Sequence, residues 1–389
     1  MSQTKSAPGR LAGEIPYEGL VPCRAGLEDL VAQEMRDLGI TVDRVGRRAV
    51  FFQSNKAGIY RMNMALRTGL NVLIPIRTFN ARNYDMLYYQ SRKTNWHKLF
   101  SVDKTIRIDV NGGSNTLNHS EYVVHRVKDG IVDTFRKLCD GVRPSINKRN
   151  PDVHVVVHLD ETEVTLALDT SGAPLFKRGY RTRHGGAPLK EDLAAAILML
   201  SEWNGNQPLL DPMCGSGTFL FEGWMIATRR APNLDRCFAF QSHFDYDPAL
   251  HEAEREKLRK AEMVTQPNLR LSGYERDAET QQIAREILVE NFPEAAIHIE
   301  KRDFREPAPR TSGHFVVTNP PYGHRLGSPA QAEELHRDLG EFLKKRCPDS
   351  TAAVFSANRP ALKSLDVQPD KVWTLYNGAL EGRLLRFTV

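Results

Sequence analysis

Apolar residues follow two different patterns along the chain. Before residue 170, apolar runs at strand spacing are mixed with segments of helical periodicity, and the last two runs join at Asp160-Glu161, which predicts a hairpin. The predicted strands cover residues 42–52, 105–110, 153–159 and 163–168, and the predicted helices cover 26–38, 57–67 and 120–139. From residue 192 onward, strands and helices alternate regularly, which is typical of a parallel sheet covered by helices. The pattern therefore predicts an α/β protein whose architecture changes between these two parts.

The regular second part closes with a different motif. Its last two apolar runs, 372–376 and 383–389, flank Asn377-Gly378 and predict a β-hairpin. The preceding strands are predicted at 208–210, 269–275, 297–300, 315–317 and 352–356, and the helices at 192–200, 218–228, 278–291 and 329–347. Residues 229–268 interrupt this alternation. Because acids and bases alternate over 247–262, we interpret the insertion as a solvated helical excursion without chemistry.

A chain of 389 residues is too long for one ordinary domain. We divide it into a disordered tail (1–15), a small α/β unit (16–80), a second α/β unit (81–170), a linker (171–190) and a C-terminal α/β domain (191–389). No apolar run is long enough to span a bilayer, and the polar start of the chain lacks the features of a secretory signal. Five cysteines without CxxC spacing favour reduced thiols in the cytoplasm over disulfides or a zinc site.

The stretch Asn319-Pro320-Pro321-Tyr322-Gly323 follows the buried apolar run 315–317. Two consecutive prolines end the strand, so Asn319 stands at its carboxyl end, where ligands bind in open α/β sheets. The Asn319 amide oxygen and the Pro320 carbonyl can each accept a hydrogen bond from a planar NH2 group, and the Tyr322 ring can stack on the base that carries it. The motif predicts a site for an exocyclic amine; a proline-rich turn is the plainer alternative.

A second candidate site follows the strand that ends at Leu210. Asp211 opens the sequence DPMCGSGT, whose glycines let a ligand approach the backbone and whose last residue starts a helix with unpaired N–H groups. The sequence is neither a Walker A loop nor a complete dinucleotide fingerprint, which leaves room for a ligand with a ribose and a small charged tail. Glu275 ends the next strand and can accept from ribose hydroxyls, while Asp303 and Phe304 follow the third strand and can bind an adenine amine and its ring.

Basic residues gather in two places. Between residues 61 and 100, seven Lys and Arg stand against one acid, with aromatic residues interleaved, and the chain as a whole carries a net charge of +5. Basic groups bind phosphates and rings stack on bases, so RNA is the expected partner, with a solvated charged face as the plainer alternative. Residues 177–190 add five basic residues and no acid, which predicts a basic strip between the halves. The residues expected to contact RNA are Arg82, Arg92, Lys93, Arg178 and Arg181.

Four short segments of the first half together resemble a THUMP domain, an RNA-binding module of RNA-modifying enzymes. They are Leu117-Asn118-His119-Ser120, Arg126-Val127-Lys128-Asp129, Arg143-Pro144-Ser145 and Asn150-Pro151-Asp152-Val153. The unit at 16–80 resembles the ferredoxin-like domain that usually precedes THUMP. The resemblance implies that this half binds RNA, and it adds Arg126 and Lys128 to the expected RNA contacts.

The second half resembles the class I S-adenosylmethionine-dependent methyltransferases. Its motifs DPMCGSGT, GYERD, DF and NPPYG occur in that family's order, and seven strands ending in a reversed hairpin match its Rossmann-like fold. The whole chain is similar to the RlmL type, bacterial enzymes that methylate the N2 amine of a guanine in 23S ribosomal RNA. The sequences RGYR (178–181), APL (187–189) and YNGALEGRLL (376–385) are similar to flanking motifs of that family. Some members carry a second methyltransferase domain, and we expect only the first here.

This resemblance implies S-adenosylmethionine as cofactor and 23S rRNA, or a large-subunit precursor, as partner, without a metal. The catalytic residues that it implies are Asn319, Pro320 and Tyr322. The implied cofactor-binding residues are Pro188, Leu189, Asp211, Cys214, Gly215, Gly217, Thr218, Glu275, Arg276, Asp303, Phe304 and Asn319. In the expected mechanism, the guanine N2 attacks the sulfonium methyl in line, and Asn319 and Pro320 favour a pyramidal nitrogen.

Other functions share the same motif. An NPPY site also occurs in adenine-N6 DNA methyltransferases and in glutamine methyltransferases of release factors, because it specifies a planar amine and not the molecule that carries it. The RNA-binding half weighs against both. A tRNA guanine-N2 methyltransferase with the same fold is a closer alternative. A non-catalytic RNA-binding protein is the alternative from another class, although Asn319, Gly215 and Gly217 are all present.

Overall fold

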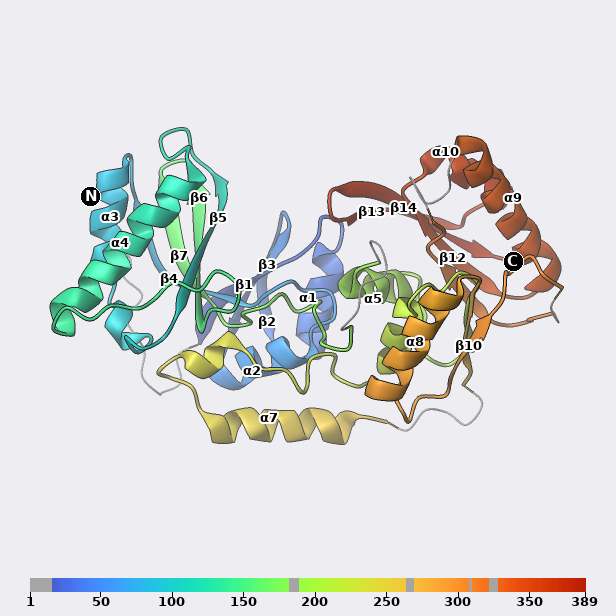
Figure 1. Cartoon of the computed structure of the whole chain (residues 1–389), viewed down its shortest axis with the longest axis horizontal. Helices are drawn as coiled ribbons and strands as arrows, with labels where there is room; N and C mark the ends of the chain where they lie inside the picture. The colour runs from blue at the N-terminus through green and yellow to red at the C-terminus, as the bar shows by residue number, and fades with distance from the viewer. Residues whose placement is uncertain (1–15, 182–188, 264–268, 308–309, 322–327) are drawn as a thin grey trace.

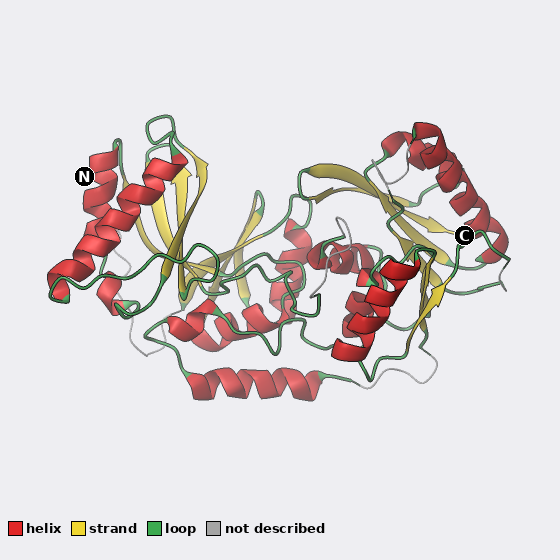
Figure 2. Cartoon of the chain, viewed as in Figure 1, coloured by secondary structure: helices red, strands yellow, loops and turns green. Residues whose placement is uncertain are grey.

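The structure is a computed structural model that describes residues 16–181, 189–263, 269–307, 310–321 and 328–389. It contains two seven-stranded sheets, one in each half of the chain (Figures 1 and 2). The expected tail at 1–15 lies outside the described residues. The fold class predicted from the sequence is confirmed: an N-terminal mixed α/β region is followed by a Rossmann-like domain.

The N-terminal sheet has the order β2-β3-β1-β4-β7-β6-β5 and is antiparallel except for the pair β5–β6. Strand β4 joins its two parts: it meets β1 at the single pair Leu20–Leu73 and β7 along most of its length. The strands are β1 Tyr17–Pro22, β2 Thr41–Gly46, β3 Ala49–Ser54, β4 Leu73–Asn80, β5 Ile106–Gly113, β6 Val153–Asp160 and β7 Glu163–Asp169. The helices are α1 Glu28–Asp37, α2 Lys56–Ala65, α3 Tyr84–Arg92 and α4 Ser120–Leu138, with a 3-10 turn at Trp96–Lys98.

The C-terminal sheet has the order β10-β9-β8-β11-β12-β14-β13, and its first five strands run parallel. The final hairpin adds β14 antiparallel to β12, as the sequence pattern predicts. The strands are β8 Leu209–Asp211, β9 Leu271–Glu275, β10 Ile297–Lys301, β11 Phe315–Thr318, β12 Thr351–Ser356, β13 Lys371–Asn377 and β14 Leu380–Thr388. The helices are α5 Glu191–Leu200, α6 Thr218–Ala227, α7 Pro248–Ala261, α8 Ala278–Asn291, α9 Pro329–Arg346 and α10 Arg359–Leu362, with 3-10 turns at Ala239–Ser242 and Lys363–Leu365.

The described part of the insertion, residues 229–263, packs against the N-terminal half, so the expectation of a solvated excursion needs correction. Its helix α7 runs beneath α2 (Figure 1), and Phe238 and Phe240 enter the hydrophobic core of the small N-terminal unit. The buried carboxylate of Glu254 pairs with Arg61 of α2 at 2.7 Å. The alternating charges lie on the outer face of α7, and its inner face packs against the N-terminal half.

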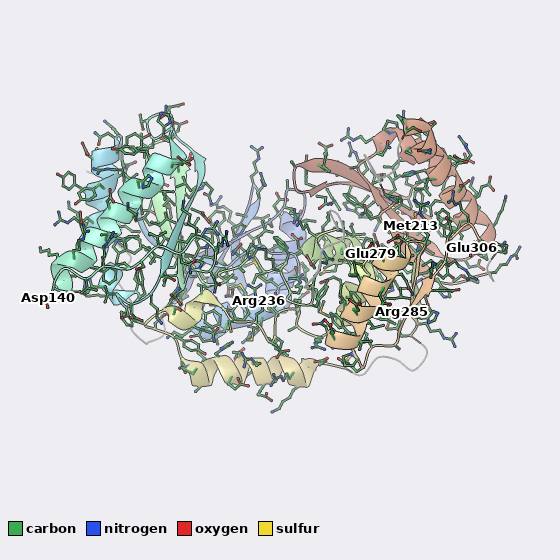
Figure 3. All side chains as sticks on the ribbon, viewed as in Figure 1. Asp140, Met213, Arg236, Glu279, Arg285 and Glu306 are labelled. Atoms are coloured by element: carbon green, nitrogen blue, oxygen red, sulfur yellow. The ribbon has the colours of Figure 1, made fainter. Side chains whose placement is uncertain are left out.

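Further contacts fix the two halves together. Arg24 donates twice to the fully buried carboxylate of Asp192 at the start of α5, at 2.6 and 2.9 Å. Leu27, just before α1, belongs to the core of the C-terminal sheet. Arg236 of the insertion lies near the centre of the molecule (Figure 3) and donates to the carbonyls of Ala173 and Pro174. The RNA-binding half predicted from the sequence is therefore held in one position relative to the candidate site.

Candidate active site

The parallel strands β8, β9 and β11 bring three predicted site residues to one edge of the sheet. Strand β8 lies between the other two, with Leu210 opposite Val316 and Asp211 opposite Gly273. Asp211, Glu275 and Asn319 stand at the carboxyl ends of these neighbours, which is the ligand-binding edge of an open α/β sheet. Figure 3 shows Met213, from the loop after β8, and Glu279, from the start of α8, on the same side of the C-terminal half.

The glycine loop after β8 closes over the end of β9. Cys214 donates its backbone N–H to the Tyr274 carbonyl at 2.9 Å, and Gly215 donates to the Glu275 carboxylate at 2.9 Å. Gly215 and Gly217 both have positive φ angles, +54° and +83°, which favour glycine. A side chain at Gly215 would meet no atom within 4 Å, so this side of the loop is open to a ligand.

The electrostatic character of the loop is acidic. Burial, with a smaller contribution from the nearby Glu275 carboxylate, raises the pKa of Asp211 to about 7. The Asp211 carboxylate accepts the backbone N–H of Met213 at 3.1 Å. Burial also raises the pKa of Cys214 well above its ordinary value, so this thiol stays protonated and unreactive. Two acids beside an open glycine loop suit a ligand that carries a diol and a cationic group.

Asn319 presents the other half of the site. It follows the fully buried strand β11, and Pro320 after it is buried as well. Among the residues that the structure describes, the buried Asn319 amide oxygen has no hydrogen-bond partner. Leaving such an acceptor unpaired costs about 1–3 kcal/mol, and an amine donor from a bound molecule would remove that cost. Tyr322, the third residue of the predicted catalytic set, lies outside the described residues.

The predicted adenine-binding residues lie differently from the expectation. Both carboxylate oxygens of Asp303 accept from the Arg305 guanidinium, at 2.9 and 2.6 Å, and this pairing lowers the pKa of Asp303. The Phe304 ring is buried in the core against Phe342, 5.6 Å between ring centres. Arg276 is exposed. An adenine amine would have to share Asp303 with Arg305, a competitor two residues away.

The predicted site residues Arg178 and Leu189 of the linker are also buried. Arg178 is buried, lies 3.4 Å from the Glu222 carboxylate of α6, and donates to the carbonyls of Arg67 and Leu175. Since protein acceptors occupy its guanidinium, we do not retain Arg178 as an RNA contact. Leu189 is a core residue, and Pro188 lies outside the described residues. Thr218 begins α6 directly after the glycine loop and is buried.

Three comparisons with known proteins identify the family of this chain. The model of the RMKL-like methyltransferase domain matches residues 178–386, more than half of the sequence. The chain belongs to the RMKL-like methyltransferase family. A THUMP domain model matches residues 81–169, and an RlmL ferredoxin-like domain model matches residues 18–73. The resemblance to RlmL-type proteins found in the motifs is thereby confirmed.

Relatives of this RMKL-like methyltransferase match along almost its whole length. The ribosomal RNA large subunit methyltransferase K/L of Syntrophotalea carbinolica is 35% identical over 386 residues, which are 97% of this chain and 54% of that protein. The chain thus spans about half the length of the curated relatives it matches. The crystal structure of SMU.472 complexed with SAH has a TM-score of 0.86 at 26% identity and covers 97% of this chain and 99% of its own. A predicted N6-adenine-specific DNA methylase from Listeria monocytogenes reaches 0.86 at 27% identity, covering 98% and 99%.

The THUMP region of this family member exposes basic and aromatic side chains together. Arg82, Arg92 and Lys93 are exposed around α3. Tyr89 on α3 and Tyr122 on α4 are 58% and 49% exposed. The two remaining residues of the predicted RNA set have local partners: Arg126 pairs with Asp85 at 2.8 Å and lies over the Tyr88 ring, and Lys128 pairs with Asp129 at 3.1 Å. The exposed residues around α3 are therefore the freest to meet phosphates.

Two groups of the methyltransferase domain escaped the sequence reasoning. Arg305 donates to the Asp303 carboxylate, and its position two residues later in the sequence could have indicated this contact. Glu191, buried at the start of α5, pairs with Arg181 across ten residues, and the sequence carries no signal for that contact. Within the described ranges, no helix combines the length and the apolar character needed to cross a bilayer, and no group of three or more His, Cys, Asp or Glu could hold a metal ion.

Proposed function

We propose that this chain is an S-adenosylmethionine-dependent RNA methyltransferase that methylates the N2 amine of a guanine in the large-subunit ribosomal RNA. The observation that carries the proposal is the buried Asn319 amide oxygen at the carboxyl end of β11, which has no hydrogen-bond partner within the described residues and lies at the same sheet edge as the open glycine loop. An acceptor in this position is suited to a planar amine. The printed names of the relatives support ribosomal RNA as the substrate, and the THUMP region supports RNA binding.

The residues present fit S-adenosylmethionine. Glu275 at the end of β9 is placed to accept from ribose hydroxyls, and Asp211, in its ionised form, is placed to pair with the cationic amino group. The bound cofactor supplies a methyl group activated by a positively charged sulfur. The SAH complex of SMU.472, which shares the fold along the whole chain, supports this assignment. We retain Asp303 as a weaker candidate because Arg305 already occupies it.

Asn319 and Pro320 would act on the target amine. The lone pair of a guanine N2 is delocalised into the ring, so the amine is a poor nucleophile until it becomes pyramidal. Acceptors at the Asn319 amide and the Pro320 carbonyl strengthen their hydrogen bonds as the nitrogen gains positive charge, an interaction stronger in the transition state than in the ground state. Tyr322 would stack on the base, which must be single-stranded or flipped to enter the site.

An adenine amine is the main chemical competitor. The Listeria protein with the same overall fold is described as a predicted N6-adenine-specific DNA methylase, and an Asn-Pro-Pro-Tyr site accepts either amine. The exposed basic and aromatic residues around α3 favour RNA over DNA, because stacking on exposed rings requires unpaired bases. A guanine in tRNA would fit the same site, so the substrate test has to include tRNA.

A methyl-transfer assay with radiolabelled cofactor tests the proposal. The substrates are large-subunit RNA, small-subunit RNA and bulk tRNA, all from a strain that lacks the enzyme, and the labelled RNA is digested to nucleosides. We expect N2-methylguanosine in the large-subunit RNA alone. The same nucleoside in tRNA alone would overturn the ribosomal substrate, and N6-methyladenosine in any RNA would overturn the guanine assignment.

A further inference from the structure

Arg181 ends the linker segment that the structure describes, and it is an internal residue. Its side chain is 6% exposed, although the local sequence is a basic strip. Nη1 lies 3.2 Å from the Glu191 carboxylate and donates to the Leu189 carbonyl at 3.3 Å. Nη2 donates to the Thr218 hydroxyl. One guanidinium therefore contacts three groups in two segments of the chain, residues 189–191 and the start of α6.

These two segments meet at the start of the helix that follows the glycine loop. Thr218 is the first residue of α6 and follows Gly217, the last residue of the loop. Glu191 is the first residue of α5, and Leu189 lies just before it. The N-termini of α5 and α6 are thus joined through Arg181. A planar guanidinium can hold an acid, a carbonyl and a hydroxyl in fixed directions at once, and a flexible Lys ammonium cannot.

The same linker segment contacts α6 one turn further along. Tyr180 donates its hydroxyl to the Glu222 carboxylate at 3.1 Å, and Arg178 lies beside the same carboxylate. Residues 218 and 222 are four apart and therefore share one face of the helix. Arg178 also donates to the carbonyl of Arg67 in the N-terminal half. The segment 178–181 thus lies between the N-terminal half and the helix that carries the cofactor loop.

We propose that Arg181 is a positioning residue for the cofactor site: it fixes the start of α6, and through it the glycine loop, in the conformation that binds the cofactor. This inference rests on the proposed use of S-adenosylmethionine. It replaces the RNA contact predicted from the sequence. Removing the guanidinium would leave the buried Glu191 carboxylate unpaired, and burial already raises the pKa of that group. The start of α6 would then lose this polar contact with the start of α5, while the exposed basic residues around α3 would be unaffected.

The test compares Arg181→Gln with Arg82→Gln, an exposed arginine of the RNA-facing region. S-adenosylhomocysteine binding is measured by calorimetry, and RNA binding by a filter assay. We expect Arg181→Gln to weaken cofactor binding by about ten-fold or more, the loss expected for hydrogen bonds to a charged group, with RNA affinity unchanged. Arg82→Gln should give the reverse pattern. Loss of RNA affinity with normal cofactor binding in Arg181→Gln, or no change in either, would overturn the proposal.

Two further variants separate positioning from a purely structural role. Arg181→Lys keeps the charge opposite Glu191 but cannot reach all three partners, so its cofactor affinity should lie between wild type and Arg181→Gln. In steady state, the KM for the cofactor should rise while kcat changes little. If Arg181→Gln does not fold, Glu191→Gln removes the ion pair and keeps the Thr218 contact, and Glu191 is not among the expected cofactor-binding residues. The cofactor affinity of this variant should fall several-fold, and an unchanged value would overturn the proposal.

The outcome is distinguishable from failure of the proposed function. If the wild-type protein binds S-adenosylhomocysteine but methylates no guanine, the proposed substrate is wrong and the role of Arg181 can still be measured. If the wild-type protein binds no S-adenosylhomocysteine, the cofactor assignment and the role of Arg181 are both overturned.

Discussion

The two seven-stranded sheets of this protein expose their functional residues in opposite ways. In the C-terminal sheet, neighbouring strands run parallel, so Asp211, Glu275 and Asn319, far apart in sequence, meet at one edge. In the N-terminal sheet, most neighbours run antiparallel, and successive strand ends fall on opposite edges. The candidate RNA residues of that half therefore gather on and around its covering helices. Parallel strands thus bring candidate residues together at one edge of a sheet, whereas antiparallel strands do not.

The difference extends to burial and to the kind of change that mutation should produce. The C-terminal site holds a buried carboxylate with a raised pKa and a buried amide oxygen that no described residue pairs with, so we expect the loss of a single polar atom to have a large effect there. The N-terminal surface holds exposed charges, and we expect their contributions to phosphate binding to be small, similar and nearly additive. Mutations in the first region should change methyl transfer or cofactor binding, and mutations in the second should change RNA affinity.

The largest effect should follow the loss of one amide. Asn319→Ala removes the acceptor for the target amine, and we expect kcat to fall by about 100- to 1,000-fold, as for other groups that stabilise a transition-state charge. RNA and cofactor affinities should stay near wild type. Single-turnover methyl transfer measures the change. A variant that retains turnover would remove Asn319 from the mechanism and break the contrast between the two regions.

The N-terminal sheet contains a partly buried charge cluster that should respond to pH. His154 of β6 lies between Asp109 and Asp169, at 2.7 and 2.8 Å, and is 13% exposed. Burial alone lowers the pKa of His154, but the two carboxylates outweigh it and raise the pKa to about 9. Because the folded-state pKa lies above the unfolded value, the stabilisation is complete below about pH 6.5 and is lost as pH rises through 9. We expect a loss of about 2 kcal/mol between about pH 7 and about pH 9.

A matched variant isolates this group from all others that titrate in the same range. His154→Gln cannot become charged, so its stability should lack this component. Thermal unfolding should show wild type more stable than His154→Gln near neutral pH and equally stable near about pH 9.5. Parallel curves for the two proteins would show that the cluster does not hold a charged imidazole.

The exposed surface should give a smaller and graded effect. Reversing the charges of Arg82, Arg92 and Lys93 to Glu should weaken RNA binding by about ten-fold or more and lower the slope of log affinity against log salt by about 3. Cofactor affinity should not change. Reversal of three exposed lysines of the other half, Lys260, Lys345 and Lys363, is the matched control. Equal RNA affinity in the two triple variants would place the RNA-binding surface elsewhere.

Much of the C-terminal fold could be predicted because its strands are short, buried and separated by motifs with Gly and Pro. The N-terminal sheet was harder, and β1, β4 and α3 were all missed. Strand β4 contains Pro75 and Arg77 and does not alternate cleanly, so only its pairing with β7 defines it. Helix α3 begins at the Asn83 cap, but of its residues only Leu87 and Ser91 are buried.

The candidate site shows the same limit at the level of single residues. The Gly-rich loop and Asn319 were predictable because their backbone chemistry is local. The burial of Arg178 and Arg181 was not, since Glu222 lies 44 residues from Arg178 and Thr218 lies 37 residues from Arg181. A basic strip in sequence became an internal contact once these partners were present. A run of basic residues predicts an exposed basic surface only where no partner distant in the sequence holds those residues inside the fold.

The smallest effect should be a pH dependence confined to the parallel sheet. Burial holds the pKa of Asp211 at about 7, so this carboxyl is mostly protonated near pH 6. A cationic cofactor favours the ionised form, and binding should therefore release a proton and weaken as pH falls through 7. We expect cofactor affinity about eight-fold lower near pH 6 than near pH 7.5. Calorimetry with S-adenosylhomocysteine measures this affinity as a function of pH, with Asp211→Asn as control. The variant should bind the cofactor weakly, and its affinity should not change with pH. An equal pH dependence in both proteins would assign the titration to another group and show that Asp211 does not contact the ligand.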